Sequence, residues 1–75
     1  MGKHQSDILE YIICCVGVFA ERFSLTNSQA FKYMQEHQGL TFLQKHYNIL
    51  HTLSLDDAVE DCARICLRHG GALTL

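Results

Sequence analysis

An apolar stripe between residues 8 and 20 limits what this chain can fold into. Plotted at 100° per residue, its apolar side chains fall within an arc of roughly 160°. The members of the stripe are Ile8, Leu9, Ile12, Ile13, Cys15, Val16, Phe19 and Ala20. Glu10, Cys14, Gly17 and Glu21 occupy the opposite side. An arc this wide is typical of a helix covered on more than one side, so residues 7–23, with Ser6 as N-cap, are predicted to form the central helix of a bundle.

Capping signals predict three further helices. Thr26 and Gln29 have the spacing of a capping box, which begins a helix over 27–37, and Gly39 is expected to end it. A short helix follows over 40–47. Ser54 is the expected N-cap of the last helix, 55–69, and Gly70 with Gly71 ends it. The sequence thus predicts an all-α fold, a compact bundle of four helices in a single domain over 1–75 with a short apolar C-terminal tail.

Size and charge narrow the classes of function. The chain has 75 residues, of which 48% are hydrophobic, and its net charge is −2. Ordering costs roughly 1.5 kcal/mol per residue, which nearly cancels the gain from burial in so small a core, so tight packing, self-association or a partner is expected to help. The six Lys and Arg residues are spread singly, which argues against nucleic-acid binding. The apolar run 11–20 is about half a membrane span, so no membrane partner and a cytoplasmic location are expected.

The four cysteines do not have the spacing of a disulfide framework. Cys14 and Cys15 are adjacent, and Cys62 and Cys66 are four residues apart, which places both on one face of a helix. We interpret Cys15, Cys62 and Cys66 as core residues in a reducing compartment, with Cys14 near water. A zinc site formed by Cys62, Cys66 and a histidine is an alternative, although the usual ligand pairs are missing. No cofactor and no metal are expected.

A segment before the last helix resembles the signature of a known family. It is similar to Y-x-x-L-H-T, then Ser or Gly, then an acidic helix with V-x-D. The matching positions are Tyr47, Leu50, His51, Thr52, Ser54, Val59 and Asp61. The chain therefore resembles a family of very small bacterial proteins of unknown function, numbered 3791, over about residues 6 to 70. The start at 7–15 and the Leu25-Thr26 pair also fit, whereas the last five residues do not map onto the pattern.

The resemblance implies a role beside another protein. Members of this family are often encoded next to a second small family that looks like an ADP-ribosyltransferase. By analogy, this chain would be the non-catalytic member, an antitoxin-like or accessory partner. That implication is an association and supplies no mechanism.

Six residues are candidates for binding a partner or for locking the loop before the last helix: Tyr47, Leu50, His51, Thr52, Asp57 and Asp61. Leu50 can plug the core beneath the loop, while the polar groups can bond loop backbone. Alternatively, His51 and the two carboxylates could form a polar site. No set of nucleophile, base and orienting group is apparent, so no enzyme is expected.

Three hypotheses of function follow. The leading one is a non-catalytic protein–protein interaction module whose acidic helix start suits a basic surface. The alternative is a self-associating structural homodimer that buries apolar surface of the first helix or of the tail. A small metal-binding or His51-dependent enzyme is the third.

Overall fold

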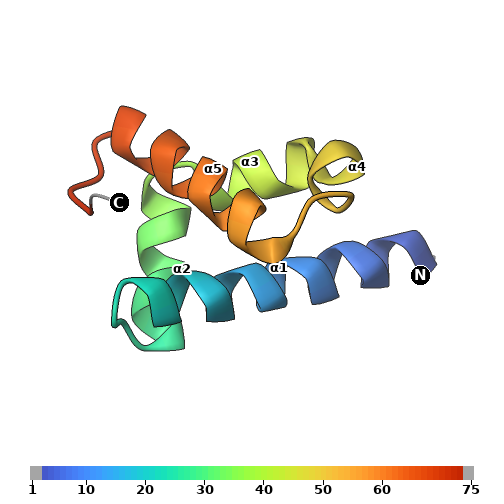
Figure 1. Ribbon diagram of the computed structural model, residues 1–75, viewed down its shortest axis with the longest axis horizontal. Coiled ribbons are helices and arrows are strands. Elements are labelled where there is room, and N and C mark those ends of the chain that lie inside the picture. The colour runs from blue at the N-terminus through green and yellow to red at the C-terminus, as the bar shows by residue number, and fades with distance from the viewer. Residues whose placement is uncertain (1–2, 74–75) are drawn as a thin grey trace.

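The chain is all-helical in a computed structural model that describes residues 3–73, with side chains from Asp7 onward (Figure 1). Its helices are α1 (Lys3–Arg22), α2 (Asn27–Glu36), α3 (Gly39–Lys45), α4 (Tyr47–Leu50) and α5 (Leu55–Arg68). In Figure 1, α2 rises from the C-terminal end of α1 toward α3, and α5 crosses over the same face of α1. The predicted all-α class is confirmed.

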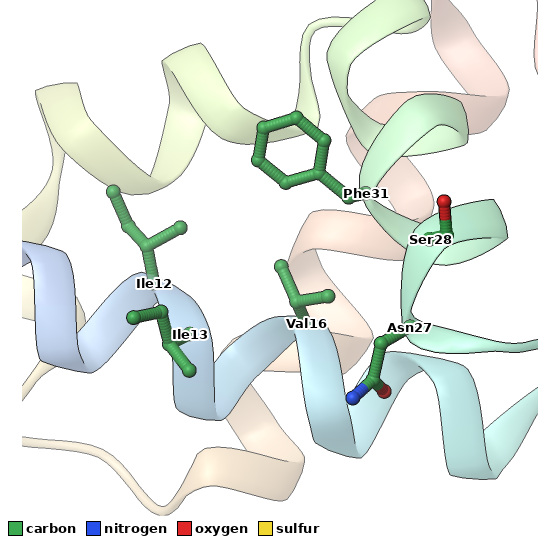
Figure 2. A pocket seen from close by; sticks show the side chains of 6 residues that line it. All are labelled: Ile12, Ile13, Val16, Asn27, Ser28 and Phe31. Carbon is green, nitrogen blue, oxygen red and sulfur yellow. The ribbon is translucent and has the colours of Figure 1, made fainter.

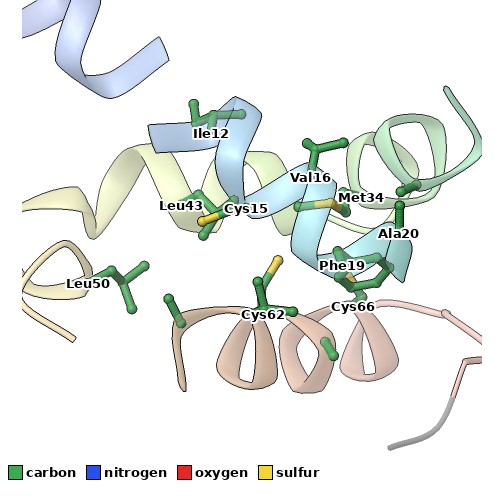
Figure 3. Close-up of a cluster of buried hydrophobic side chains, with 14 residues drawn as sticks. Ile12, Cys15, Val16, Phe19, Ala20, Met34, Leu43, Leu50, Cys62 and Cys66 are labelled. Carbon is green, nitrogen blue, oxygen red and sulfur yellow. The ribbon is translucent and has the colours of Figure 1, made fainter. Parts of the chain in front are cut away.

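Helix α1 is the central element, as its apolar arc predicts. It packs against α2, α3 and α5. The core that these helices share contains fully buried Phe19, Met34, Leu43 and Val59, together with three cysteines (Figure 3). The covering of α1 is uneven, because Leu9 and Ile13 remain 51% and 69% exposed.

The predicted N-caps of α2 and α5 are confirmed. Thr26 Oγ1 accepts a hydrogen bond from the Gln29 N–H at 3.1 Å, and Gln29 Oε1 accepts one from the Thr26 N–H at 2.9 Å. Ser54 Oγ accepts from the Asp57 N–H at 3.1 Å. The expected N-cap at Ser6 is wrong, because α1 already begins at Lys3. A local capping signal inside a longer helix does not by itself set the helix start.

The prediction that Gly39 ends the helix over 27–37 is wrong, as the connection between α2 and α3 shows. Helix α2 ends at Glu36, and Gln38 takes the left-handed conformation with φ 69°. Gly39 instead begins α3 and is buried. A β-carbon at this position would lie 2.8 Å from Cys66 Sγ and 3.0 Å from Cys62 Sγ. The glycine is therefore required by close packing rather than by a positive φ.

The predicted helix 40–47 is divided in two. Helix α3 ends at Lys45, and His46 leaves helical geometry with φ −109° and ψ 18°. The chain then forms the single turn α4, which the sequence does not separate from α3. Apolar spacing continues through Tyr47, which is why the pattern predicts one helix across the break.

The segment after α5 packs back onto α2. Gly70 has φ +90°, which turns the chain, and the Leu73 N–H donates to the Tyr33 hydroxyl at 3.2 Å. His37 Nδ1 lies 3.0 Å from the His69 carbonyl oxygen. Leu73 is partly buried against the core, so residues 70–73 of the apolar tail belong to the fold. The remaining tail positions, 74–75, lie outside the described residues.

Candidate functional site in the α4–α5 connection

The segment that links α4 to α5 is held by short-range contacts. His51 Nδ1 lies 2.7 Å from the Tyr47 carbonyl oxygen, and the Thr52 hydroxyl donates to the Ile49 carbonyl at 2.6 Å. The rings of Tyr47 and His51 stack with centroids 4.7 Å apart and an interplanar angle of 15°. Leu50 lies in the core at 3% exposure. These contacts fix the turn while His51 and Thr52 face solvent.

Tyr47 also connects this segment to α1. Its ring meets that of Tyr11 edge-on, with centroids 5.3 Å apart. The Tyr11 hydroxyl oxygen is buried and finds no hydrogen-bond partner among the described residues. Burial, with a smaller effect of Cys15, raises the pKa of Tyr11 above its usual range. Sequence reasoning missed Tyr11, whose only signal is its place at the edge of the apolar stripe.

The outward face of α5 carries four carboxylates, which we call the acidic ridge: Asp56, Asp57, Glu60 and Asp61. Arg64 pairs with Glu60, four residues earlier in α5, at 2.9 Å and with Asp61 at 3.6 Å. Arg22 at the end of α1 lies 3.7 Å from Asp56 and 3.9 Å from Glu60.

Two arginines against four carboxylates leave the acidic ridge with a net charge of −2. Asp57 is exposed, and within residues 7–73 no ion pair reaches it. Such exposed pairs each contribute at most about 1 kcal/mol. The sequence gives no signal for the contribution of Arg22, because its partners lie more than thirty positions away.

The predicted polar site of His51, Asp57 and Asp61 is not held together by direct hydrogen bonds or ion pairs among the described side chains. No hydrogen bond or ion pair among the described side chains joins His51 to Asp57 or Asp61. Likewise, within the part of the chain that the structure describes, no group of three or more His, Cys, Asp or Glu residues is placed to hold a metal ion. His51 is positioned by Tyr47, and the two aspartates belong to the acidic ridge.

The thiols are distributed as predicted. Cys15, Cys62 and Cys66 are fully buried in the core (Figure 3). Cys14 is exposed. The Cys62 thiol donates to the Gly39 carbonyl at 3.7 Å. Burial raises the pKa of Cys15 to about 11, and the neighbouring Cys66 side chain, together with burial, raises the pKa of Cys62. Buried, protonated thiols of this kind act as small apolar core residues.

A second surface feature is an apolar groove between α1 and α2. It encloses about 350 Å³. The residues that line it are Ile12, Ile13, Val16, Asn27, Ser28 and Phe31 (Figure 2). Phe31 is 45% exposed. Sequence reasoning missed this groove as a site, although the width of the apolar stripe is a signal for it.

The comparisons with known proteins place the chain by family. Over the described residues, no helix has both the length and the apolar character needed to cross a bilayer. No curated protein and no solved structure matches the sequence. A family described as a protein of unknown function, DUF3791, matches residues 10–69, from the eighth residue of α1 to the residue after α5. The match leaves out the segment from Gly70 onward, and it covers well over half of the sequence. The chain therefore belongs to the family DUF3791.

Proposed function

We propose that this chain is a non-catalytic protein–protein interaction module that binds its partner through the α4–α5 connection and the acidic ridge. The observation that carries the proposal is the exposure of large apolar residues directly before the ridge. Ile49, Leu53 and Leu55 are 66%, 41% and 37% exposed. We call these three residues and the acidic ridge together the α4–α5 surface. Exposed large apolar residues beside a polar rim are typical of binding surfaces.

The rigidity of the connection supports this role. Thr52 is bonded to Ile49, His51 is stacked on Tyr47, and Leu50 anchors the turn in the core. A segment that is already ordered loses less conformational entropy when a partner binds than a disordered segment does. The same contacts that lock the loop therefore also prepare it for docking.

The charge of the ridge indicates the chemistry of the partner. With a net charge of −2 and Asp57 free of described ion pairs, the ridge complements a basic surface and would accelerate encounter with one. The resemblance described above implies a bacterial partner that is ADP-ribosyltransferase-like and encoded nearby, and a cytoplasmic location for this chain fits its free thiols. In that setting the chain acts as the antitoxin-like or accessory member of the pair.

Co-expression with the product of the adjacent gene tests this function. Affinity purification and native mass determination should yield a stoichiometric complex with the unchanged chain. Asp57→Lys and Ile49→Glu should each weaken it at least tenfold. Glu36→Lys is the matched control, because it reverses a carboxylate that is also exposed but lies at the C-terminal end of α2.

Circular dichroism separates loss of binding from loss of fold. All three variants change exposed side chains and should keep the helical spectrum of the unchanged protein. If Asp57→Lys and Glu36→Lys bind equally well, the acidic ridge is not the contact surface. If the unchanged chain ignores the neighbouring product altogether, the antitoxin-like role is refuted.

A further inference from the structure

The imidazole ring of His51 is held in one orientation by Tyr47. Its Nδ1 lies 2.7 Å from the Tyr47 carbonyl oxygen, and the two rings stack at an interplanar angle of 15°. A ring carbon would not approach an oxygen so closely, because such contacts lie at about 3.3–3.6 Å. The same carbonyl oxygen also accepts the backbone N–H of His51 at 3.0 Å. Backbone and side chain of His51 are therefore both bonded to one acceptor.

This hydrogen bond determines which nitrogen of the neutral ring carries the hydrogen. A carbonyl oxygen only accepts, so Nδ1 donates and must bear the hydrogen. A neutral imidazole has a single N–H, which leaves Nε2 with a lone pair. The two nitrogens point away from each other, so Nε2 is directed away from the Tyr47 carbonyl. His51 is exposed, and within residues 7–73 no hydrogen bond or ion pair engages its Nε2.

We propose that Nε2 of His51 accepts a hydrogen bond from a lysine or arginine side chain of the partner, while Nδ1 locks the turn. This inference rests on the proposed function, because it assigns the role of one atom within the α4–α5 surface. Ile49 and Leu53 lie two residues before and two residues after His51 and are 66% and 41% exposed. A partner that covers both apolar side chains also covers the ring between them and removes water from Nε2.

The lone pair of Nε2 defines what the partner must place opposite it. An acceptor that loses water and gains no donor weakens a complex, so the site selects partners that present a hydrogen there. The side chains of lysine and arginine are rich in N–H groups and accept no hydrogen bonds. The acidic ridge, with its net charge of −2, favours the same cationic side chains. Acceptor and ridge thus point to one chemistry.

NMR of the isotope-labelled chain tests the position of the hydrogen without any partner. Correlations between the ring hydrogens and the ring nitrogens distinguish a nitrogen that bears hydrogen from one that has a lone pair. At mildly alkaline pH, where imidazoles are neutral, Nδ1 of His51 should give the signal of an N–H and Nε2 that of a bare nitrogen. The reverse assignment would overturn the inference and leave the proposed function standing.

Two substitutions separate the roles of the two nitrogens. In His51→Asn, the amide nitrogen takes the place of Nδ1 and can donate to the Tyr47 carbonyl, but nothing replaces Nε2. In His51→Gln, the amide oxygen reaches the place of Nε2 and can accept, but the bond to Tyr47 is lost. His51→Asn should therefore keep the Tm of the unchanged chain and weaken the complex with the neighbouring gene product at least tenfold. His51→Gln should lower the Tm and weaken the complex clearly less.

His46→Asn is the matched control, because His46 is also exposed but lies between α3 and α4, outside the α4–α5 surface. It should leave the affinity unchanged in titration calorimetry with the neighbouring gene product. If His51→Asn binds as tightly as the unchanged chain, or if His51→Asn and His51→Gln bind equally, the inference is overturned while the proposed function stands. If the unchanged chain forms no complex, the proposed function is refuted and the inference with it.

Discussion

Replacing Gly39 with alanine should destabilise the fold, although the backbone there accepts alanine. Gly39 begins α3 and has no positive φ, so the conformational preference alone would favour the larger residue by about 0.4–1 kcal/mol. The added methyl, however, would lie 2.8 Å from Cys66 Sγ, 3.0 Å from Cys62 Sγ and 3.2 Å from Met34 Cβ. All three distances are shorter than an ordinary van der Waals contact.

The neighbours of that methyl cannot easily move. Cys62 and Cys66 lie on one face of α5 and are fully buried, and the Met34 atom is attached directly to the α2 backbone. Forcing a methyl into a packed core typically costs about 1–3 kcal/mol. After the conformational gain is subtracted, we expect a net loss of about 1–2 kcal/mol, which lowers Tm by roughly 5–15 °C in a domain of this size.

Thermal unfolding followed by circular dichroism measures this loss, and a double variant tests its cause. Gly39→Ala combined with Cys66→Ala removes the nearest sulfur, so the double variant should lose clearly less stability than the sum of the two single changes. Gly17→Ala is the control, because a methyl group at this position would meet no atom within 4 Å. In dilute solution it should stabilise the chain by about 0.5–1 kcal/mol. A Gly39→Ala protein with an unchanged or higher Tm would refute the packing argument. If the stability losses of the two single variants add up in the double variant, the Cys66 sulfur is not the atom that the added methyl clashes with.

Two further predictions concern a helix cap and the buried thiols. Ser54→Ala removes the acceptor of the Asp57 N–H and should lower the free energy of unfolding, measured with urea, by about 1 kcal/mol. Ser28→Ala, at an exposed α2 position, should lower it clearly less. Equal losses for the two variants would contradict the capping role of Ser54. Alkaline pH should also destabilise the fold, because burial raises the pKa of Cys15 to about 11 from an ordinary value of 9.0. The unfolded chain then loses this proton before the native chain does, so stability is complete below pH 9 and falls by up to about 3 kcal/mol as pH approaches 11. Urea unfolding at pH 7, 9 and 10.5 measures the fall, and a flat profile would mean that Cys15 is not shielded from water.

Features that depend on neighbours in the sequence were predictable from it. The capping box at Thr26 and the cap at Ser54 need only residues three positions away. The pairing of Glu60 with Arg64 needs only the next turn of the helix. The central place of α1 follows from the width of its apolar stripe, and the burial of three cysteines from their helical spacing.

Features that depend on distant segments were not predictable in the same way. Gly39 has the pattern of a helix stop, and only the approach of Cys62 and Cys66 shows that it is a packing residue. Leu9 and Ile13 are exposed while Ile12 between them is only 7% exposed, which depends on the side of α1 that the other helices cover. Within the candidate site, the internal bonds of the 47–52 turn follow from local polar groups, whereas the ion pairs of Arg22 and the contact of Tyr11 with Tyr47 require the fold.

The placement of the four thiols allows the opening of the helix bundle to be followed by the reaction of the protein's own cysteines. Cys14 is exposed, while Cys15, Cys62 and Cys66 lie where α1 and α5 meet beneath α3. A thiol reagent added to the folded chain will modify Cys14 at once and will reach the others only when the helices separate. The rate of the slow phase of that reaction therefore measures the opening of the bundle without any introduced label. A ligand or second copy that holds the helices together will lengthen it.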